Sequence, residues 1–128
     1  MTAGGQRFRP AQHLRTRADF NRPRSLGFQA DCAGFVCRIL PPLDASALPL
    51  RRFGVIASRR VGNAVVRNRA KRLFREIFRK NQAALPEACD VLIIVRSSYQ
   101  RYDYQNLEER YLKACRRRRK AEANEPTH

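Results

Sequence analysis

Residues 52–80 read RFGVIASRRVGNAVVRNRAKRLFREIFRK, and this stretch determines most of what the sequence predicts. Apolar and polar residues alternate at its start, which predicts a β-strand over Arg52–Ser58. Gly62 and Asn63 then end the alternation, because glycine permits a tight turn and asparagine is a good helix N-cap. A helical repeat of apolar residues follows, so a helix is predicted from Ala64 to Asn81.

The predicted helix has two chemically different faces. At about 100° per residue, one side collects the apolar residues Val66, Ala70, Leu73, Phe74, Ile77 and Phe78. The opposite side collects Asn68, Lys71, Arg72, Arg75 and Arg79, with Arg67, Arg69 and Lys80 on its shoulders. Solvated helix faces normally mix charges, since like charges four residues apart destabilise a helix. One acidic residue, Glu76, opposes this array, which therefore favours a polyanionic partner.

The composition supports the same interpretation. The 128 residues include 27 lysines and arginines against 11 acidic residues, a formal net charge of +16. Eleven of these basic residues lie within residues 51–80. Repulsion among so many positive charges lowers the stability of a folded protein. Proteins with such a charge usually bind a polyanion, which neutralises it. Nucleic acid is the leading candidate, ahead of an anionic membrane surface or an acidic protein.

The remaining pattern predicts a single α+β domain. A short helix is expected after Thr16 and before Pro23, two strands within Leu26–Leu40, a buried strand over Asp90–Arg96, and a last helix from near Asp103 to Arg116. The element order is therefore α-β-β-β-α-β-α, with helices packed on a four-stranded mixed sheet.

The two ends of the chain and its cysteines complete the predictions. Residues 1–12 are expected to be a disordered arm, 13–115 the folded domain, and 116–128 a flexible basic tail. No apolar run reaches the length of a membrane span, and no secretion signal is expected. The four cysteines lack the spacing of a zinc site, which predicts buried thiols in a reducing cytoplasm.

Residues 52–75 closely resemble the protein subunit of bacterial ribonuclease P. The resemblance rests on Arg-Asn-Arg at residues 67–69, the basic residues that follow it, and the preceding basic pair with Val-Gly-Asn at residues 59–63. Weaker similarity extends over Leu14–Cys115.

The resemblance implies a fold and two sets of binding residues. It implies a left-handed crossover through the central helix, which is rare elsewhere. The residues expected to bind the catalytic RNA subunit are Asn63, Arg67, Asn68, Arg69, Lys71, Arg72 and Arg75. Those expected to bind the 5′ leader of precursor tRNA are Phe20, Phe35, Arg38, Arg59, Arg60 and Arg96. The family often has a second aromatic residue four positions after Phe20, where this chain has Arg24 beside Pro23, and Phe28 is a candidate replacement.

The resemblance also implies where the chemistry resides. The RNA subunit would bind Mg²⁺ and cleave precursor tRNA endonucleolytically, leaving the mature tRNA 5′ end, and the protein would assist in the cytoplasm. No catalytic or metal-binding residue is assigned to the chain, because its acidic residues are scattered and neither histidine has an acid–base partner. Membrane and DNA are not expected partners.

Three other functions compete with this prediction. A ribosomal protein or RNA chaperone would explain the charge equally well. A DNA-binding regulator is disfavoured because a strand, and no second helix, precedes the basic helix. Membrane binding through Arg116–Lys120 is disfavoured because that run has no apolar face of its own. Phe20, Phe35 and Phe53 are candidates for base stacking, although for any one of them a place in the core is the simpler expectation.

Overall fold

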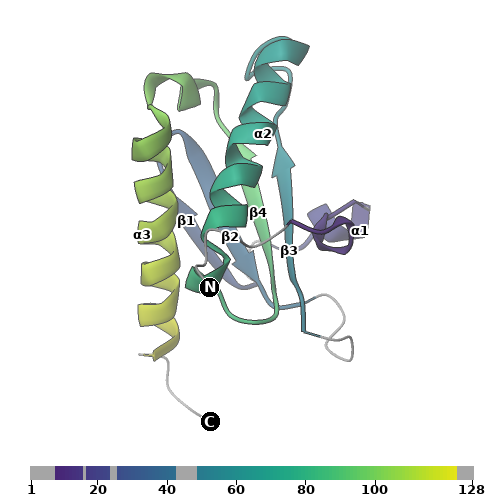
Figure 1. Ribbon diagram of the computed structural model, residues 1–128, viewed down its shortest axis with the longest axis vertical. Helices are drawn as coiled ribbons and strands as arrows, with labels where there is room; N and C mark the ends of the chain where they lie inside the picture. Colours follow the sequence, from purple (N-terminus) through teal and green to yellow (C-terminus); the bar gives the residue numbers. More distant parts are fainter. Residues whose placement is uncertain (1–7, 16, 24–25, 43–48, 124–128) are drawn as a thin grey trace.

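The computed structural model describes residues 8–15, 17–23, 26–42 and 49–123. Their centre is a four-stranded sheet in the order β1-β2-β4-β3, with α2 and α3 on one of its faces (Figure 1). The strands are β1 Phe28–Asp31, β2 Phe35–Leu40, β3 Arg51–Ile56 and β4 Cys89–Val95. The α-helices are α1 Arg17–Phe20, α2 Ala64–Lys80 and α3 Tyr104–Ala123. Short 3-10 turns are η2 Pro10–Gln12, η3 Gln82–Ala84 and η4 Ser97–Arg101.

The sheet is mixed, as predicted. β2 is antiparallel to both β1 and β4, whereas β3 and β4 are parallel and are joined through α2. In Figure 1, α2 lies in front of the sheet, β3 points upward and β4 lies to its left. The β3–α2–β4 crossover is therefore left-handed, against the strong general preference for right-handed crossovers.

The ends of the folded region differ from the predicted boundaries of 13 and 115. Phe8 already contacts Phe53 and Phe78, and Gln12 is buried, so ordered packing begins before residue 13. At the other end α3 continues to Ala123, so residues 116–123 are helical and are not a flexible tail. Thr16, expected to cap the first helix, lies outside the described residues.

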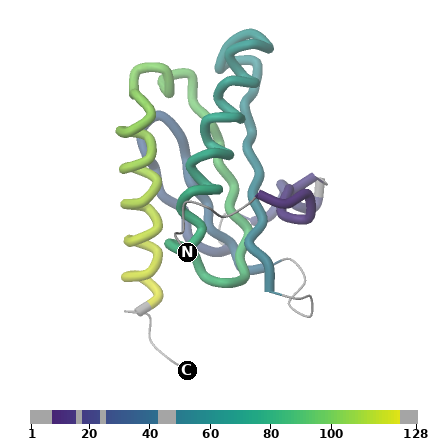
Figure 2. The backbone as a smooth tube through the Cα atoms, viewed as in Figure 1, coloured from purple at the N-terminus to yellow at the C-terminus, as the bar shows by residue number. Residues whose placement is uncertain are grey.

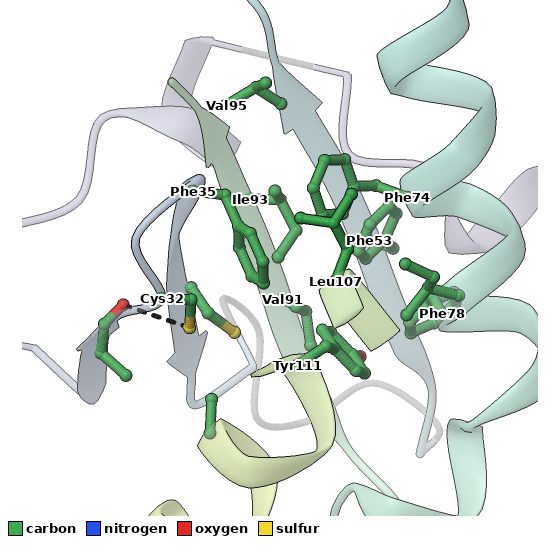
Figure 3. Packing of buried hydrophobic residues seen from close by; sticks show 14 of the residues in the cluster. Cys32, Phe35, Phe53, Phe74, Phe78, Val91, Ile93, Val95, Leu107 and Tyr111 are labelled. Atoms are coloured by element: carbon green, nitrogen blue, oxygen red, sulfur yellow. Dashed lines mark hydrogen bonds between the residues drawn. The ribbon is translucent and has the colours of Figure 1, made fainter. Parts of the chain in front are cut away.

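One face of the sheet carries the hydrophobic core. Because side chains alternate along a strand, every second residue of β2, β3 and β4 points towards α2 and α3. Figure 3 shows this cluster. The rings of Phe35 and Phe74 meet edge-on with their centroids 4.8 Å apart, and the rings of Phe53 and Phe78 stack with their centroids 4.6 Å apart. The apolar face of α2 is therefore covered by the sheet, as the helical repeat predicted.

Residues 14–15 and 17–23 lie against the other face of the sheet. The backbone passes along the open edge of β3, where the amide of Leu14 donates to the carbonyl of Phe53 at 3.0 Å (Figure 2). α1 then packs over Gly54, where an added Cβ would lie 2.9 Å from the Phe20 ring and 3.0 Å from Leu14. A glycine is needed here because any side chain would displace α1.

All four cysteines are buried free thiols. Burial raises the pKa of Cys32 to about 11, that of Cys115 to about 11 and that of Cys89 to about 12, and it also raises the pKa of the fully buried Cys37 well above its usual value. At neutral pH these groups are protonated and act as small apolar side chains.

The described residues contain no group of three His, Cys, Asp or Glu side chains able to hold a metal ion. No helix in the described ranges is long and apolar enough to cross a membrane.

Ala33 provides a small test of the backbone. Its φ is +68°, in the left-handed region that a Cβ disfavours, and the Asp31 carboxylate accepts its amide at 2.9 Å. Ala33→Gly keeps this hydrogen bond and relieves the strain, so we expect it to stabilise the fold by about 0.5–1 kcal/mol. Urea unfolding followed by circular dichroism measures the change. The control, Ala83→Gly, lacks the strained φ and should lower stability; a loss with Ala33→Gly would contradict the prediction.

Candidate nucleic-acid interface

α2 begins at Ala64, as predicted, with Asn63 as its N-cap. The side-chain Oδ1 of Asn63 accepts a hydrogen bond from the amide of Val66 at 3.0 Å, which satisfies one of the exposed amides of the first turn. Asn63 is thereby committed to capping the helix, although its exposed amide group still faces solvent.

The outer face of α2 is cationic and accessible. Arg69, Arg72 and Arg75 are exposed, as is Asn68, whereas Arg67 and Lys71 are half-buried on one shoulder. The only described ion pairs of α2 join Glu76 to Arg79 and Lys80 to Glu108. The other cations of α2 therefore have no described acidic partner, and we call Arg67, Arg69, Lys71, Arg72 and Arg75 the α2 array.

The electrostatics around α2 follow from these pairs. The hydrogen bonds from Arg79, at 2.7 and 2.9 Å, lower the pKa of Glu76, so this carboxylate stays charged and neutralises Arg79. Burial, followed by the charges of Arg75 and Arg15, lowers the pKa of His13. His13 is therefore neutral at pH 7.

Two residues expected in the leader-binding set are buried in the structure. Phe35 is 0% exposed and points into the core against Phe74, on the face opposite Phe20. Arg38 is on the same face as Phe20 but is 5% exposed, and its guanidinium donates to the carbonyls of Arg22 and Pro23 at 3.2 and 2.6 Å. Arg38 therefore holds the segment after α1 in place.

The other aromatic candidates are also accounted for. Phe53 is 1% exposed, so its place in the core is the correct alternative. Phe28 pairs with Ile39 on the core side of the sheet and cannot replace a ring beside Phe20. Phe20 itself is half-buried against Gly54, which leaves part of its ring accessible.

The remaining cations of the leader-binding set lie at one end of the sheet. Arg59 and Arg60 are exposed in the turn after β3, and Arg96 follows β4. Because β3 and β4 are parallel, these positions lie at the same end. Arg96 is exposed but donates to Asp31 at 2.7 Å and to the carbonyl of Ala33 at 3.1 Å, so its charge is partly neutralised.

A family model described as Ribonuclease P matches residues 8–119 of this chain. This chain belongs to the ribonuclease P protein family. The protein component from Petrotoga mobilis is 32% identical over 117 residues, covering 88% of this chain and 96% of the relative. That from Syntrophobacter fumaroxidans is 36% identical over 94 residues, covering 73% and 76%.

Solved structures agree with the family. The ribonuclease P protein from Thermotoga maritima is 29% identical with a TM-score of 0.68, covering 82% of this chain and 96% of that one. The Staphylococcus aureus ribonuclease P protein is 24% identical with a TM-score of 0.69, covering 82% and 93%, and shows the likeness of fold. The chain is thus the accessory protein subunit of ribonuclease P, which acts with an RNA subunit in maturing the tRNA 5′ end.

Sequence reasoning missed the ion-pair network that fixes α1 of this ribonuclease P protein. Asp90 is 1% exposed, pairs with the buried Arg22, and accepts two hydrogen bonds from Arg52 at 2.8 and 2.9 Å. Arg52 also lies 3.3 Å from Asp19 of α1. The sequence does show a carboxylate, Asp90, at the start of the apolar run of β4. Its partners Arg22 and Arg52 are far away in the sequence, so no local pattern reveals the network.

A second omission is an apolar row on the face of the sheet that carries α1. Val36, Ile94 and Ile56 are register partners across β2, β4 and β3, and each is half-buried. They lie on the same face as Gly54, and therefore on the face that Phe20 covers. The signal was in the sequence, because a solvated sheet face would carry polar residues at these positions.

Proposed function

We propose that the two sides of this protein bind two different RNA segments. The α2 array, with Asn63 and Asn68, binds phosphates of the catalytic RNA subunit. The opposite face, with Phe20 and the row Val36–Ile94–Ile56, receives the single-stranded 5′ leader of precursor tRNA. The observation that carries the proposal is the α2 array: a row of cations without described acidic partners on a helix whose other face is buried.

The leader surface follows from stacking and charge. Unpaired bases stack on aromatic rings and pack against aliphatic side chains, and Phe20 beside the apolar row offers both. Arg59, Arg60 and Arg96 lie at the end of the same sheet and supply positive charge for the leader phosphates. Phe35 and Arg38 have no part in this surface because both are buried.

Mg²⁺ enters the proposal as an ion held mainly by the RNA subunit. The described side chains offer no cluster of carboxylates or imidazoles to hold it. The protein contributes fixed positive charge, which offsets the repulsion between two polyanions and lowers the concentration of Mg²⁺ they need. We further propose that the protein acts in the cytoplasm, where precursor tRNA is made in bacteria.

Reconstitution tests the proposed function. The full chain is combined with the matching RNA subunit and precursor tRNA at low Mg²⁺, and 5′ cleavage is measured. We expect the protein to raise the cleavage rate well above that of the RNA alone. If the rate does not rise while the protein still binds RNA, the chain is an RNA-binding protein without this role. Competition with duplex DNA at fixed salt should favour structured RNA.

Phe20→Ala tests the leader surface. Loss of one stacked base costs about 1–3 kcal/mol, so we expect affinity for leader-bearing precursor tRNA to fall about tenfold, with mature tRNA unaffected. Holoenzyme affinity for both RNAs is measured at one salt concentration. Phe8→Ala is the control, because Phe8 packs on the core at the other face and its removal affects stability alone. Equal losses for both tRNAs would contradict the assignment.

A further inference from the structure

The last turns of α3 have a fixed position on the molecule. Arg118, Ala121 and Glu122 line a hollow of about 550 Å³ together with residues from the end of the sheet, among them Pro41 and Pro86. Arg118 donates to Glu122 within this wall. Ala114 and Cys115 are buried and Arg117 lies over the ring of Phe28, so α3 packs on the sheet here and its outward-facing side chains have defined positions.

Five cations form a stripe on the outward side of α3. They follow one another at spacings of three, three, one and three residues, within about 60° of a single line along the helix: Arg110, Lys113, Arg116, Arg117 and Lys120. The stripe, which we call the α3 stripe, extends over about 15 Å. Four of the five are exposed, and Arg110 is half-buried.

The α3 stripe is not neutralised within the described part of the protein. The described ion pairs of α3 involve Glu108 and Glu122, whose partners are Lys80 and Arg118. Glu109 lies four residues before Lys113, yet the structure shows no ion pair between them. The favourable effect of cations near a helix C-terminus falls off within the last turn and does not reach Arg110 or Lys113. Repulsion among the cations of the α3 stripe therefore destabilises the isolated helix.

Two guanidinium groups of the stripe are already held in place. Arg110 lies over the ring of Tyr102, 4.5 Å from its centroid, and donates to Asn106 at 2.6 Å. Arg117 lies over the ring of Phe28, at 6.0 Å. Contacts of this kind leave the charge unneutralised while restricting the side chain, so less entropy is lost on binding a phosphate.

We propose that the α3 stripe is a second phosphate-binding surface for the RNA subunit, separate from the α2 array; this inference rests on the proposed function. α3 lies with α2 on the helical side of the sheet, whereas the leader surface is on the other side (Figure 1). The stripe points away from α2, so one partner that reaches both surfaces must be broader than a single strand. A large folded RNA meets that requirement, and arginine is suited to forked phosphate contacts.

The test uses the double variant Arg116→Ala/Lys120→Ala, whose side chains are both exposed. Binding of the full chain to the RNA subunit, without tRNA, is measured across a salt series. We expect about a tenfold loss of affinity at 0.15 M salt and a salt slope reduced by roughly 1.4–1.8. Arg101→Ala/Arg119→Ala removes the same charge from exposed positions outside the stripe and should lose less than about twofold.

Three outcomes separate the possibilities. A loss no larger than that of the control would overturn the inference. A loss seen with precursor tRNA, and absent with the RNA subunit, would overturn the assignment to the RNA subunit. The variant Arg69→Ala/Arg72→Ala/Arg75→Ala is measured in parallel. If this triple variant binds the RNA subunit normally, the proposed function itself fails. If the triple variant is impaired and the α3 double variant is not, only the role of the α3 stripe fails.

Discussion

Asp90→Asn is expected to destabilise the protein by about 3–5 kcal/mol, which makes it the most damaging of the substitutions considered. Asp90 is the carboxylate shared by Arg22 and Arg52, and both Asp90 and Arg22 are almost fully buried. Removing its charge leaves the guanidinium of Arg22 buried without a counter-ion. Arg52 is partly exposed and can be hydrated instead. Urea unfolding monitored by circular dichroism gives the free energy of unfolding.

Two further variants identify the cause of that loss. Asp31→Asn breaks the exposed pair with Arg96 and should change stability far less, since solvent screens that pair. Arg22→Met in the Asp90→Asn background removes the uncompensated charge and should recover part of the lost stability. If Asp90→Asn were as mild as Asp31→Asn, or if Arg22→Met gave no recovery, the network would not be what holds α1 on the sheet.

Arg69→Ala/Arg72→Ala/Arg75→Ala is expected to weaken binding of the RNA subunit by about two to three orders of magnitude at 0.15 M salt. Each lost phosphate contact should also reduce the salt slope by about 0.7–0.9. The stability of the protein without RNA should stay level or rise, because alanine favours the helix and like-charge repulsion is relieved. A purely structural role for these arginines would give the opposite change in stability.

Arg79→Ala is the matched control for this array. Arg79 is on the same face of α2, but its charge is already neutralised by Glu76. We expect its removal to weaken RNA binding by less than about threefold. A loss with Arg79→Ala as large as that of the triple variant would mean that net charge alone, and not the position of the array, determines affinity. Filter binding with the RNA subunit over a salt series distinguishes the two.

The parts of the fold that were predictable depend on local periodicity. The alternation in β3 and the helical repeat in α2 place these elements within two residues of their observed bounds, and β1 and β2 lie within the predicted Leu26–Leu40. The same alternation puts Phe35 on the core side, together with Cys37 and Ile39. The leader-binding assignment of Phe35 came from the family resemblance, and the observed register overrides it.

The parts that were not predictable depend on contacts between distant segments. Arg38 is buried because its partners are backbone carbonyls of Arg22 and Pro23, which no pattern within β2 reveals. Beyond residue 115 the helix is accompanied by contacts that the basic run does not reveal, since Arg117 lies over the ring of Phe28 and Arg118 pairs with Glu122. The basic run alone reads as a solvated tail. The array on α2 was predictable because all its members lie on one helix, where Arg69, Arg72 and Arg75 are exposed and the helical repeat alone fixes their face.

The four core thiols make this protein convenient for mapping its contacts. Each is protonated and shielded in the native state, so alkylating reagents added at neutral pH should leave the folded chain unmodified. A cysteine introduced at an exposed position such as Gln105 or Lys113 would then be the most reactive thiol in the molecule. Spin labels, fluorophores or photo-crosslinkers can therefore be attached at chosen surface points without first deleting the native cysteines.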